Sequence, residues 1–320
     1  MTALLLTALA SFFSIVELNC ENLFDCRHDS LKQDTEFLPD APRHWTPARY
    51  WQHLNRTAQT ILACGEHATE EGGRTEMIPD LVVLTEVEND SVMFDLTRRS
   101  LLRNAGYEYL MTDSPDLRGI DVALLYSPFT FRPLSSDTLR VDPPAGMRPT
   151  RDILYVQGRV LSGDTLHVLV VHAPSRSDGE RHTRPYRKKV AERVLQAVQD
   201  ILARQPQARI VVAGDFNDYA TDENMKLYAR GGLIDVSAQA LGSHGARGTY
   251  RHQGRWGSLD HILLSPSLMG NVRDCYVFDA PFLLTEDTRY GGVQPRRNYL
   301  GPRYLNGFSD HLPLVLRMEW

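Results

Sequence analysis

Residues 209–218 read Arg-Ile-Val-Val-Ala-Gly-Asp-Phe-Asn-Asp, an apolar run that ends in a carboxylate and a carboxamide. A short apolar run closed by a glycine is typical of a buried β-strand. Asp215 and Asn217 are therefore expected at a strand end, where one side chain can orient a nucleophile and the other can bind an anionic oxygen. Taken alone, the stretch also fits a strand-terminating turn, because Asp and Asn form local hydrogen bonds in turns.

Acidic, amide and imidazole side chains recur at five other strand boundaries. Any one of them has an ordinary explanation, such as a satisfied structural histidine or a turn-capping carboxylate, but their joint occurrence favours a functional site. Neighbouring side chains on an extended segment point to opposite faces, so an Asp-His pair can serve metal and substrate at once. The side chains are Asn19 and Glu21, Glu86, His172, Asp260, and the adjacent Asp310 and His311.

Strand-like runs alternate with helical patterns over the whole chain. Thr46-Pro47 suits a helix N-cap followed by a first-turn proline, and apolar residues then recur on one face up to Leu62. A second helical stripe extends from Val190 to Ile201. The strand-like runs lie near 12–19, 81–85, 120–126, 152–160, 164–171, 209–214, 259–264 and 312–318. Stretches rich in Gly, Pro or charge predict surface loops at 65–79, 135–150, 173–187, 237–257 and 285–307.

The ordered series of polar strand ends resembles the endonuclease/exonuclease/phosphatase superfamily. That superfamily includes deoxyribonuclease I, the abasic-site nucleases, neutral sphingomyelinases and inositol-polyphosphate 5-phosphatases. The match extends from about residue 14 to residue 317, with the motifs in the family order. The resemblance implies an α/β four-layered sandwich, in which two mixed β-sheets pack face to face and helices flank them.

The resemblance also implies a metal site. Glu86 would be the principal ligand, and Asn19, Glu21 and Asp310 would supply further oxygen atoms. Oxygen ligands of this kind suit Mg²⁺, with Mn²⁺ as the alternative, because both are hard cations that keep several waters. Glu21 stands where many abasic-site nucleases have an aspartate, and its longer arm can still reach a metal.

Five residues are assigned to catalysis by the same resemblance. Asp215 would orient or deprotonate the attacking water, and Asn217 would hold a phosphate oxygen. His172 and His311 would donate hydrogen bonds to the phosphoryl oxygens, and Asp260 would pair with His311 and favour its imidazolium form. The Ala-Pro-Ser-Arg stretch after His172 lacks the tyrosine motif of the abasic-site nucleases, which favours the deoxyribonuclease I or sphingomyelinase side of the family.

Arginines are the candidates for binding an anionic substrate, because a guanidinium fork pairs with phosphate at two points. Arg176, Arg184 and Arg187 belong to a basic segment that starts beside His172, although a charge run at a helix start is more often solvated surface. Arg118 precedes a predicted strand, and we expect it either to face the cleft or to stabilise a turn.

Net charge limits the choice of partner. A formal charge of −5 and a pI near 6.1 are unlike a protein that binds nucleic acid through a broad basic face, although a local basic rim is compatible with nuclease activity. The protein is expected to be a divalent-metal-dependent phosphodiesterase, and a nuclease is favoured slightly over enzymes acting on other substrates. The alternatives are a phosphatase or phospholipase C-like enzyme acting on sugar phosphates, inositol phosphates or phospholipid headgroups and, more remotely, a catalytically silent binding protein. The expected partner is a phosphate-ester substrate, with nucleic acid among the candidates, and no obligate protein partner is evident.

Residues 1–13 are apolar and contain Ala8-Leu9-Ala10, a small-residue pattern that suits signal-peptide cleavage. The segment has no Lys or Arg in front of its apolar stretch, as a signal peptide normally has. We expect a residual signal segment over 1–13 and a single domain over 14–320. The protein is then predicted to be periplasmic or secreted, or cytoplasmic if residues 1–13 form an ordinary first strand. The segment is too short to span a bilayer, which takes about 20 residues. Four cysteines without metal-ligand spacing, Cys20, Cys26, Cys64 and Cys275, predict no structural zinc site.

Overall fold

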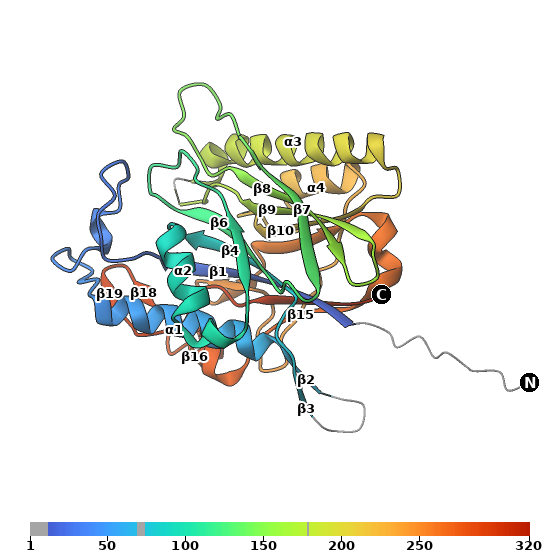
Figure 1. The fold of residues 1–320 in the computed structure, drawn as a ribbon. Coiled ribbons are helices and arrows are strands. Elements are labelled where there is room, and N and C mark those ends of the chain that lie inside the picture. Colours follow the sequence, from blue (N-terminus) through green and yellow to red (C-terminus); the bar gives the residue numbers. More distant parts are fainter. Residues whose placement is uncertain (1–11, 69–73, 178) are drawn as a thin grey trace, which may run out of the picture.

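Two six-stranded sheets are stacked between two pairs of helices in the computed structural model, which describes residues 12–68, 74–177 and 179–320 (Figure 1). The first sheet has the order β15 (Val272–Val277), β20 (Leu314–Glu319), β1 (Phe12–Leu23), β4 (Leu81–Val87), β6 (Asp121–Tyr126), β5 (Glu108–Met111). The second has the order β11 (Ile234–Asp235), β14 (Asp260–Leu264), β10 (Arg209–Asp215), β9 (Thr165–His172), β8 (Ile153–Val160), β7 (Phe131–Leu139). The predicted four-layered α/β sandwich is confirmed.

Side-chain alternation along the strands builds the layers. On β1, Ile15 packs between the two sheets, while its neighbour Val16 faces the helices on the outer side of the first sheet. On β10, Val211 packs between the sheets and Val212 faces the other pair of helices. Because successive residues of a strand point to opposite faces, strands that are apolar on both faces suit sheets covered on both sides.

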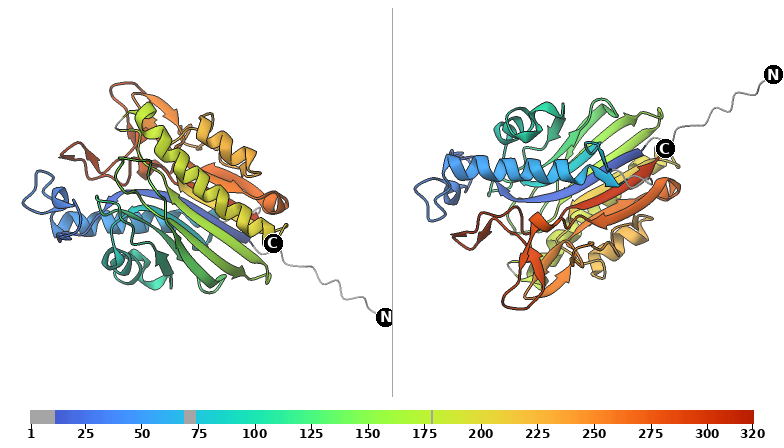
Figure 2. Two further views of the ribbon diagram at one scale, coloured as in Figure 1. Left: turned by 90° about the horizontal axis from the view of Figure 1, so that it is seen from above. Right: turned by 90° about the horizontal axis from the view of Figure 1, so that it is seen from below.

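The helices α1 (Pro47–Cys64) and α2 (Asp90–Arg98) cover the first sheet, and α3 (Glu180–Arg204) and α4 (Glu223–Arg230) cover the second (Figure 2). Thr46 caps α1, since its hydroxyl accepts the backbone N–H of Arg49 at 3.5 Å, and Pro47 occupies the first turn. The apolar stripes expected on α1 and α3 are buried against the sheets. Both helices therefore form where the sequence predicts them.

Smaller elements lie in the connections. Four two-stranded hairpins are formed by β2 (Glu66–Ala68) with β3 (Arg74–Glu76), β12 (Tyr250–His252) with β13 (Arg255–Gly257), β16 (Leu284–Glu286) with β17 (Val293–Pro295), and β18 (Tyr299–Leu300) with β19 (Arg303–Tyr304). The 3₁₀ turns are η1 (Thr35–Phe37), η2 (Leu101–Asn104), η3 (Pro266–Asn271) and η4 (Pro281–Leu283).

Two predicted loops are shorter than expected. The strand β7 continues to Leu139 inside the stretch 135–150, and α3 already begins at Glu180 inside 173–187. Residues 1–11, which carry most of the expected signal segment, lie outside the described residues, while Phe12 and Phe13 belong to β1. Within the described ranges, no helix is long and apolar enough to cross a membrane.

Gly214 is a position near the polar strand ends at which the fold tolerates no side chain. Its φ is 143°, and a Cβ placed there would lie 1.8 Å from the carbonyl oxygen of Val171 on the neighbouring strand β9. The close approach of β9 and β10 therefore requires glycine at this position.

We expect Gly214→Ala to lower the free energy of unfolding by about 3 kcal/mol or more, because the clash is with backbone that cannot rotate away. Urea unfolding followed by circular dichroism measures the change. Gly270→Ala is the matched control, since nothing lies within 4 Å of a Cβ at Gly270. Equal stability of the two variants would contradict the close-approach argument.

Candidate active site

Strand direction brings the polar ends together at one edge of the two sheets. The strand β1 runs parallel to β4, and β9 runs parallel to β10, so each pair ends at the same edge of its sheet. The strands β14 and β20 run antiparallel to β10 and β1 and therefore begin there, with Asp260 directly opposite Asp215. The Asn19 amide of β1 donates to Asp215 Oδ2 of β10 at 3.1 Å, which joins the edges of the two sheets.

Asp215 is the most heavily supported carboxylate of this edge. Its Oδ2 accepts the side-chain amides of Asn19 at 3.1 Å and Asn217 at 3.0 Å, and its Oδ1 accepts the backbone N–H of Asn217 at 2.8 Å. Burial, and then the charge of Asp260, raise the pKa of Asp215 to about 7. A carboxylate with such a pKa can take up a proton near neutral pH.

Asn217 has a different role from the one expected. Its side-chain nitrogen donates both to Asp215 and to the backbone oxygen of Ala173, at 3.0 Å each. An amide nitrogen has only two hydrogens to donate, so none remains for a phosphate oxygen. In this structure Asn217 positions Asp215, and its side-chain amide has no free hydrogen for the expected contact with a phosphate oxygen.

His172, at the end of β9, faces two carboxylates. Its Nε2 lies 3.7 Å from Asp215 Oδ2 and 3.8 Å from Glu86 Oε1. Burial, followed by the charges of Arg151 and Arg118, lowers the pKa of His172 well below its usual range. The imidazole is therefore neutral at neutral pH and can donate one hydrogen bond without bringing charge to the site.

Asp260 and His311 form a buried pair on the other side of Asp215. Asp260 Oδ2 lies 2.7 Å from His311 Nδ1 and also accepts the Thr249 hydroxyl. Burial lowers the pKa of His311, but the charge and hydrogen bond of Asp260 outweigh it, so the pKa ends well above its usual range. Ligand atoms of Asp215, Asp260 and His311 lie within 4.8 Å of one another, and the Nδ1 hydrogen bond leaves His311 Nε2 to face a substrate.

Glu86, at the end of β4, sits on a left-handed backbone. Its φ is 60°, and its Oε2 accepts the backbone N–H of Asn22 at 2.9 Å. Glu21, Asn22 and Asn217 also have positive φ, at 50°, 63° and 51°. Left-handed backbone at a non-glycine residue is costly and persists only where the surroundings impose it, and it often marks functional sites.

Glu21 is directed away from this edge, contrary to its predicted place among the metal ligands. Its carboxylate accepts the backbone N–H groups of Asn298 at 2.6 Å and Tyr299 at 2.9 Å. The pairing of β1 with β4 shifts between Asn19 and Leu23, and this bulge breaks the alternation that would place Asn19 and Glu21 on one face. Glu21 thus anchors the loop at 297–299.

Asp310 also contacts that loop but stays accessible. Its Oδ2 accepts from Arg297 Nη2 at 2.8 Å, and its side chain is 20% exposed. Glu86 is similar, with a side chain that is 15% exposed, whereas Asp215 is buried. Glu86 and Asp310 are therefore the carboxylates of the predicted set that remain open to an incoming group.

Two of the predicted substrate-binding arginines belong to helix α3 itself. Arg187 is only 1% exposed, and it donates to Asp218 Oδ1 and to the Thr183 hydroxyl at 2.7 Å each, so it is a structural cation. Arg184 pairs with Glu180 one turn earlier at 2.8 Å and faces solvent. Neither lines the site, because α3 begins earlier than predicted and fixes both side chains on its own surface.

The other two predicted arginines lie nearer the catalytic edge. Arg176 pairs with Asp222 at 2.5 Å and lies over the ring of Tyr219 at 4.9 Å. Arg118 donates to Asn22 Oδ1 at 2.6 Å and lines a cavity beside the site. Arg118 is therefore the predicted arginine that faces open space.

Several residues that shape the site lie outside the set of predicted site residues. The Ser309 hydroxyl donates to the Asn19 carbonyl at 2.7 Å and ties the start of the last strand to β1. Thr249 supports Asp260, and Arg297 holds Asp310. Serine, threonine and arginine in loops give no periodic signal, so only the fold identifies them.

Glu17 also lies outside the predicted set, although the sequence offers a signal for it. It is a lone charged residue within the apolar strand before Asn19. It is fully buried, and neither carboxylate oxygen has a hydrogen-bond partner among the described residues. Burial, and then the charges of Asp260 and Asp215, raise its pKa well above the usual range, against an opposing effect of His311. Glu17 therefore keeps its proton to a higher pH than an exposed glutamate does.

Stacked mixed sheets with these polar strand ends at one edge are the architecture of a class of phosphoric ester hydrolases. The chain belongs to the endonuclease/exonuclease/phosphatase family, whose model matches residues 14–320. Members of this family are phosphoric ester hydrolases. No curated protein sequence matches the chain.

Solved structures of the same fold cover nearly the whole chain. The endonuclease/exonuclease/phosphatase from Bacteroides vulgatus is 17% identical with a TM-score of 0.60, over 96% of this chain and 98% of that chain. The human nocturnin catalytic domain, with a bound sulfate anion, is 20% identical with a TM-score of 0.58, over 97% and 96%. The mannosyl-6-phosphatase from Bacteroides thetaiotaomicron is 16% identical with a TM-score of 0.59, over 96% and 99%. At these identities the likeness establishes the fold alone.

We expect Glu17→Gln to stabilise the protein increasingly as pH rises. The pKa of this carboxyl is higher in the folded protein than in the unfolded protein, where it is 4.5. Its contribution to the free energy of unfolding is therefore complete below pH 4.5 and is lost as the pH rises toward the folded pKa. The loss is about 1.4 kcal/mol per pH unit in that window, and glutamine has no proton to lose.

Urea unfolding in EDTA at pH 5 and pH 8 measures the difference. The exposed Glu286→Gln is the control and should change stability equally at both pH values. A pH-independent effect of Glu17→Gln would show that Glu17 is not a raised-pKa carboxyl.

Proposed function

We propose that this chain is a divalent-metal-dependent phosphodiesterase that hydrolyses phosphate esters by in-line attack of water. The observation that carries the proposal is the placing of Asp215. It accepts three hydrogen bonds, lies 3.7 Å from His172 Nε2 and neighbours the Asp260–His311 pair. A fixed base between two imidazoles suits activation of water beside a phosphoryl group whose charge needs stabilising.

The donor set of the site fits a hard divalent cation. The carboxylates of Glu86, Asp215, Asp260 and Asp310 meet at one edge, while the nearby cations are His311 and Arg297. Glu86 and Asp310 are the ligands we propose, with the Asn19 side-chain oxygen beside them, for Mg²⁺ or alternatively Mn²⁺. Such an ion, when bound, would polarise a phosphoryl oxygen and neutralise charge.

The protein groups then divide the remaining tasks. Asp215 accepts the proton of the attacking water, and Asn19 and Asn217 hold its carboxylate in place. His172, being neutral, donates from Nε2 to a phosphoryl oxygen. His311, kept cationic by Asp260, donates from its Nε2 and stabilises the charge that develops during the reaction.

We expect His311→Ala and Asp215→Asn each to lower kcat by about 10²-fold or more, because each removes a group that acts in the transition state. EDTA should abolish activity, and Glu86→Gln should raise the Mg²⁺ concentration needed for half-maximal rate. Hydrolysis of bis(p-nitrophenyl) phosphate measures all four. The exposed Asp137→Asn is the control and should keep wild-type rates. Activity indifferent to both EDTA and Glu86→Gln would rule out the metal site.

Nucleic acid is the substrate class that the sequence resemblance favours. The basic groups near the site are local, Arg118 beside the cavity and Arg176 at the rim, and the net charge is −5. A nuclease built in this way would bind over a short footprint, because long footprints depend on many phosphate contacts.

We expect purified protein with Mg²⁺ to nick supercoiled plasmid, and His311→Ala and EDTA to abolish the nicking. Agarose electrophoresis of relaxed and supercoiled forms measures it, and the two controls exclude a contaminating nuclease. Absence of nicking by folded protein that still hydrolyses bis(p-nitrophenyl) phosphate would move the substrate to a small phosphate ester.

A small phosphate ester is the second candidate, and one observation favours it. A cavity of about 520 Å³, a volume typical of sites for small molecules, is lined by Arg118, Arg151 and Pro174, which follows His172 by two residues. This candidate includes sugar and inositol phosphates and phospholipid headgroups. A catalytically silent binding protein is the least favoured reading, because every residue assigned to catalysis is present.

A further inference from the structure

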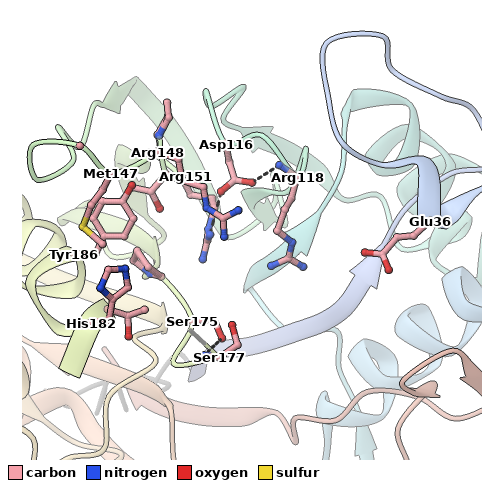
Figure 3. A pocket seen from close by; sticks show the side chains of 15 residues that line it. Glu36, Asp116, Arg118, Met147, Arg148, Arg151, Ser175, Ser177, His182 and Tyr186 are labelled. Atoms are coloured by element: carbon pink, nitrogen blue, oxygen red, sulfur yellow. Dashed lines mark hydrogen bonds and ion pairs between the residues drawn. The ribbon is translucent and has the colours of Figure 1, made fainter. Parts of the chain in front are cut away.

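The cavity beside the catalytic edge is formed by three connections that are distant in sequence. They are the loop before β6, the loop before β8, and the segment that leads from β9 into the first turns of α3, while Glu36 of η1 closes the opposite wall. Figure 3 shows the guanidinium groups of Arg118 and Arg151 directed into the same space, with Ser175 and Ser177 across it. Met147, Pro149, Pro174 and Tyr186 give the cavity apolar walls.

Each of the two arginines is linked through one intermediate residue to a residue of the candidate active site. Arg151 Nη2 donates to the Ala173 carbonyl at 2.8 Å, and this carbonyl also accepts from Asn217 at 3.0 Å. Arg118 Nη2 donates to the Asn22 side chain, whose backbone N–H donates to Glu86 Oε2. The cavity therefore continues the site and is not a separate depression.

The charge of Arg118 is not neutralised by an ion pair within the described part of the chain. Arg118 is half-buried, contacts only a neutral side-chain amide through its guanidinium, and makes no ion pair with any residue that the structure describes. Arg151 pairs with Asp116 at 3.1 Å, and Glu36 at the opposite wall pairs with Arg43. Burial, Arg151 and Arg118 together lower the pKa of His172, so the field of both cations reaches the reaction centre.

Buried polar atoms in the wall are left without partners. Thr150, Arg151 and Tyr186 are 2%, 6% and 5% exposed. Thr150 Oγ1, Arg151 Nε and the Tyr186 hydroxyl form no hydrogen bond among the residues described. Buried polar groups are normally paired, and three orphans around one cavity indicate that a polar ligand completes it.

We propose that this cavity is a second phosphate subsite, so that the substrate is a small phosphate ester carrying a second phosphoryl group. The inference rests on the proposed function, which puts the scissile phosphate between His172 and His311. The second phosphoryl group would then accept from Arg118 and Arg151, with the Tyr186 hydroxyl as a further donor. The apolar walls and the net charge of −5 favour a compact substrate over a polymer.

Binding of matched ligands tests the subsite without relying on turnover. The ligands are α,ω-alkanediol bisphosphates with two to six carbons and butyl phosphate, titrated calorimetrically with Mg²⁺ into the His311→Ala protein. We expect the best bisphosphate to bind about tenfold or more tightly than butyl phosphate, because a charged hydrogen-bonding group gains a partner. Adding Arg118→Gln should reduce this preference to less than threefold.

Two further variants separate recognition from folding. Tyr186→Phe should weaken binding of the bisphosphate while leaving the melting temperature unchanged, because the hydroxyl has no partner to lose. Arg184→Gln is the matched control, since Arg184 lies on α3 outside the cavity and pairs with Glu180, and it should keep the full preference.

The outcomes distinguish the subsite from the proposed reaction. A bisphosphate preference without hydrolysis of any phosphate ester by the wild-type protein would support the subsite and refute the proposed function. Hydrolysis of a phosphate ester without any preference for bisphosphates would support the proposed function and refute the second phosphate subsite. A preference that survives both Arg118→Gln and Tyr186→Phe, or a single-stranded oligonucleotide that binds more tightly than the best bisphosphate, would overturn the inference.

Discussion

One hydrogen bond between the two sheets, from the Asn19 amide to the Asp215 carboxylate, is the contact on which the site depends. It requires the end of β1 and the end of β10 to meet, and therefore fixes how the sheets are stacked at this edge. The close approach of β9 and β10 at Gly214 then sets where His172 lies relative to Asp215. A rigid scaffold of this kind holds catalytic groups more accurately than loops do.

The second constraint is electrostatic. Buried carboxylates repel one another and lose their hydration, so each must be paired, protonated or supplied with a cation. Asp260 is paired with His311, and the pKa of Glu17 is raised well above its usual range, so this carboxyl favours the neutral form. Glu86 and Asp310 are the partly exposed members, and they are the carboxylates that we propose as metal ligands. The site therefore holds its charge at a cost in stability, a common price of catalytic function.

The four-layered fold was implied by the family resemblance, and the strand and helix periodicity, interrupted by polar residues at the strand ends, agreed with it. The positions of His172 and Asp215 follow from that pattern alone. Glu21 was misplaced because a bulge in β1, invisible to the alternation rule, turns its carboxylate to another loop. Arg187 was misread because a charge run does not reveal a buried partner such as Asp218. The cavity was not foreseen at all, since the residues that line it come from separate loops and only the packed structure brings them together.

The pairing of β1 with β20 has a consequence for how the protein forms in the cell. Phe12 lies opposite Glu319, so the first described strand pairs with the last, and His311 belongs to the segment just before that strand. During synthesis β1 leaves the ribosome long before β20, so one edge of β1 stays unpaired until residues 311–319 have emerged. A nascent chain that stops short of these residues consequently lacks His311 and cannot complete this edge of the two sheets.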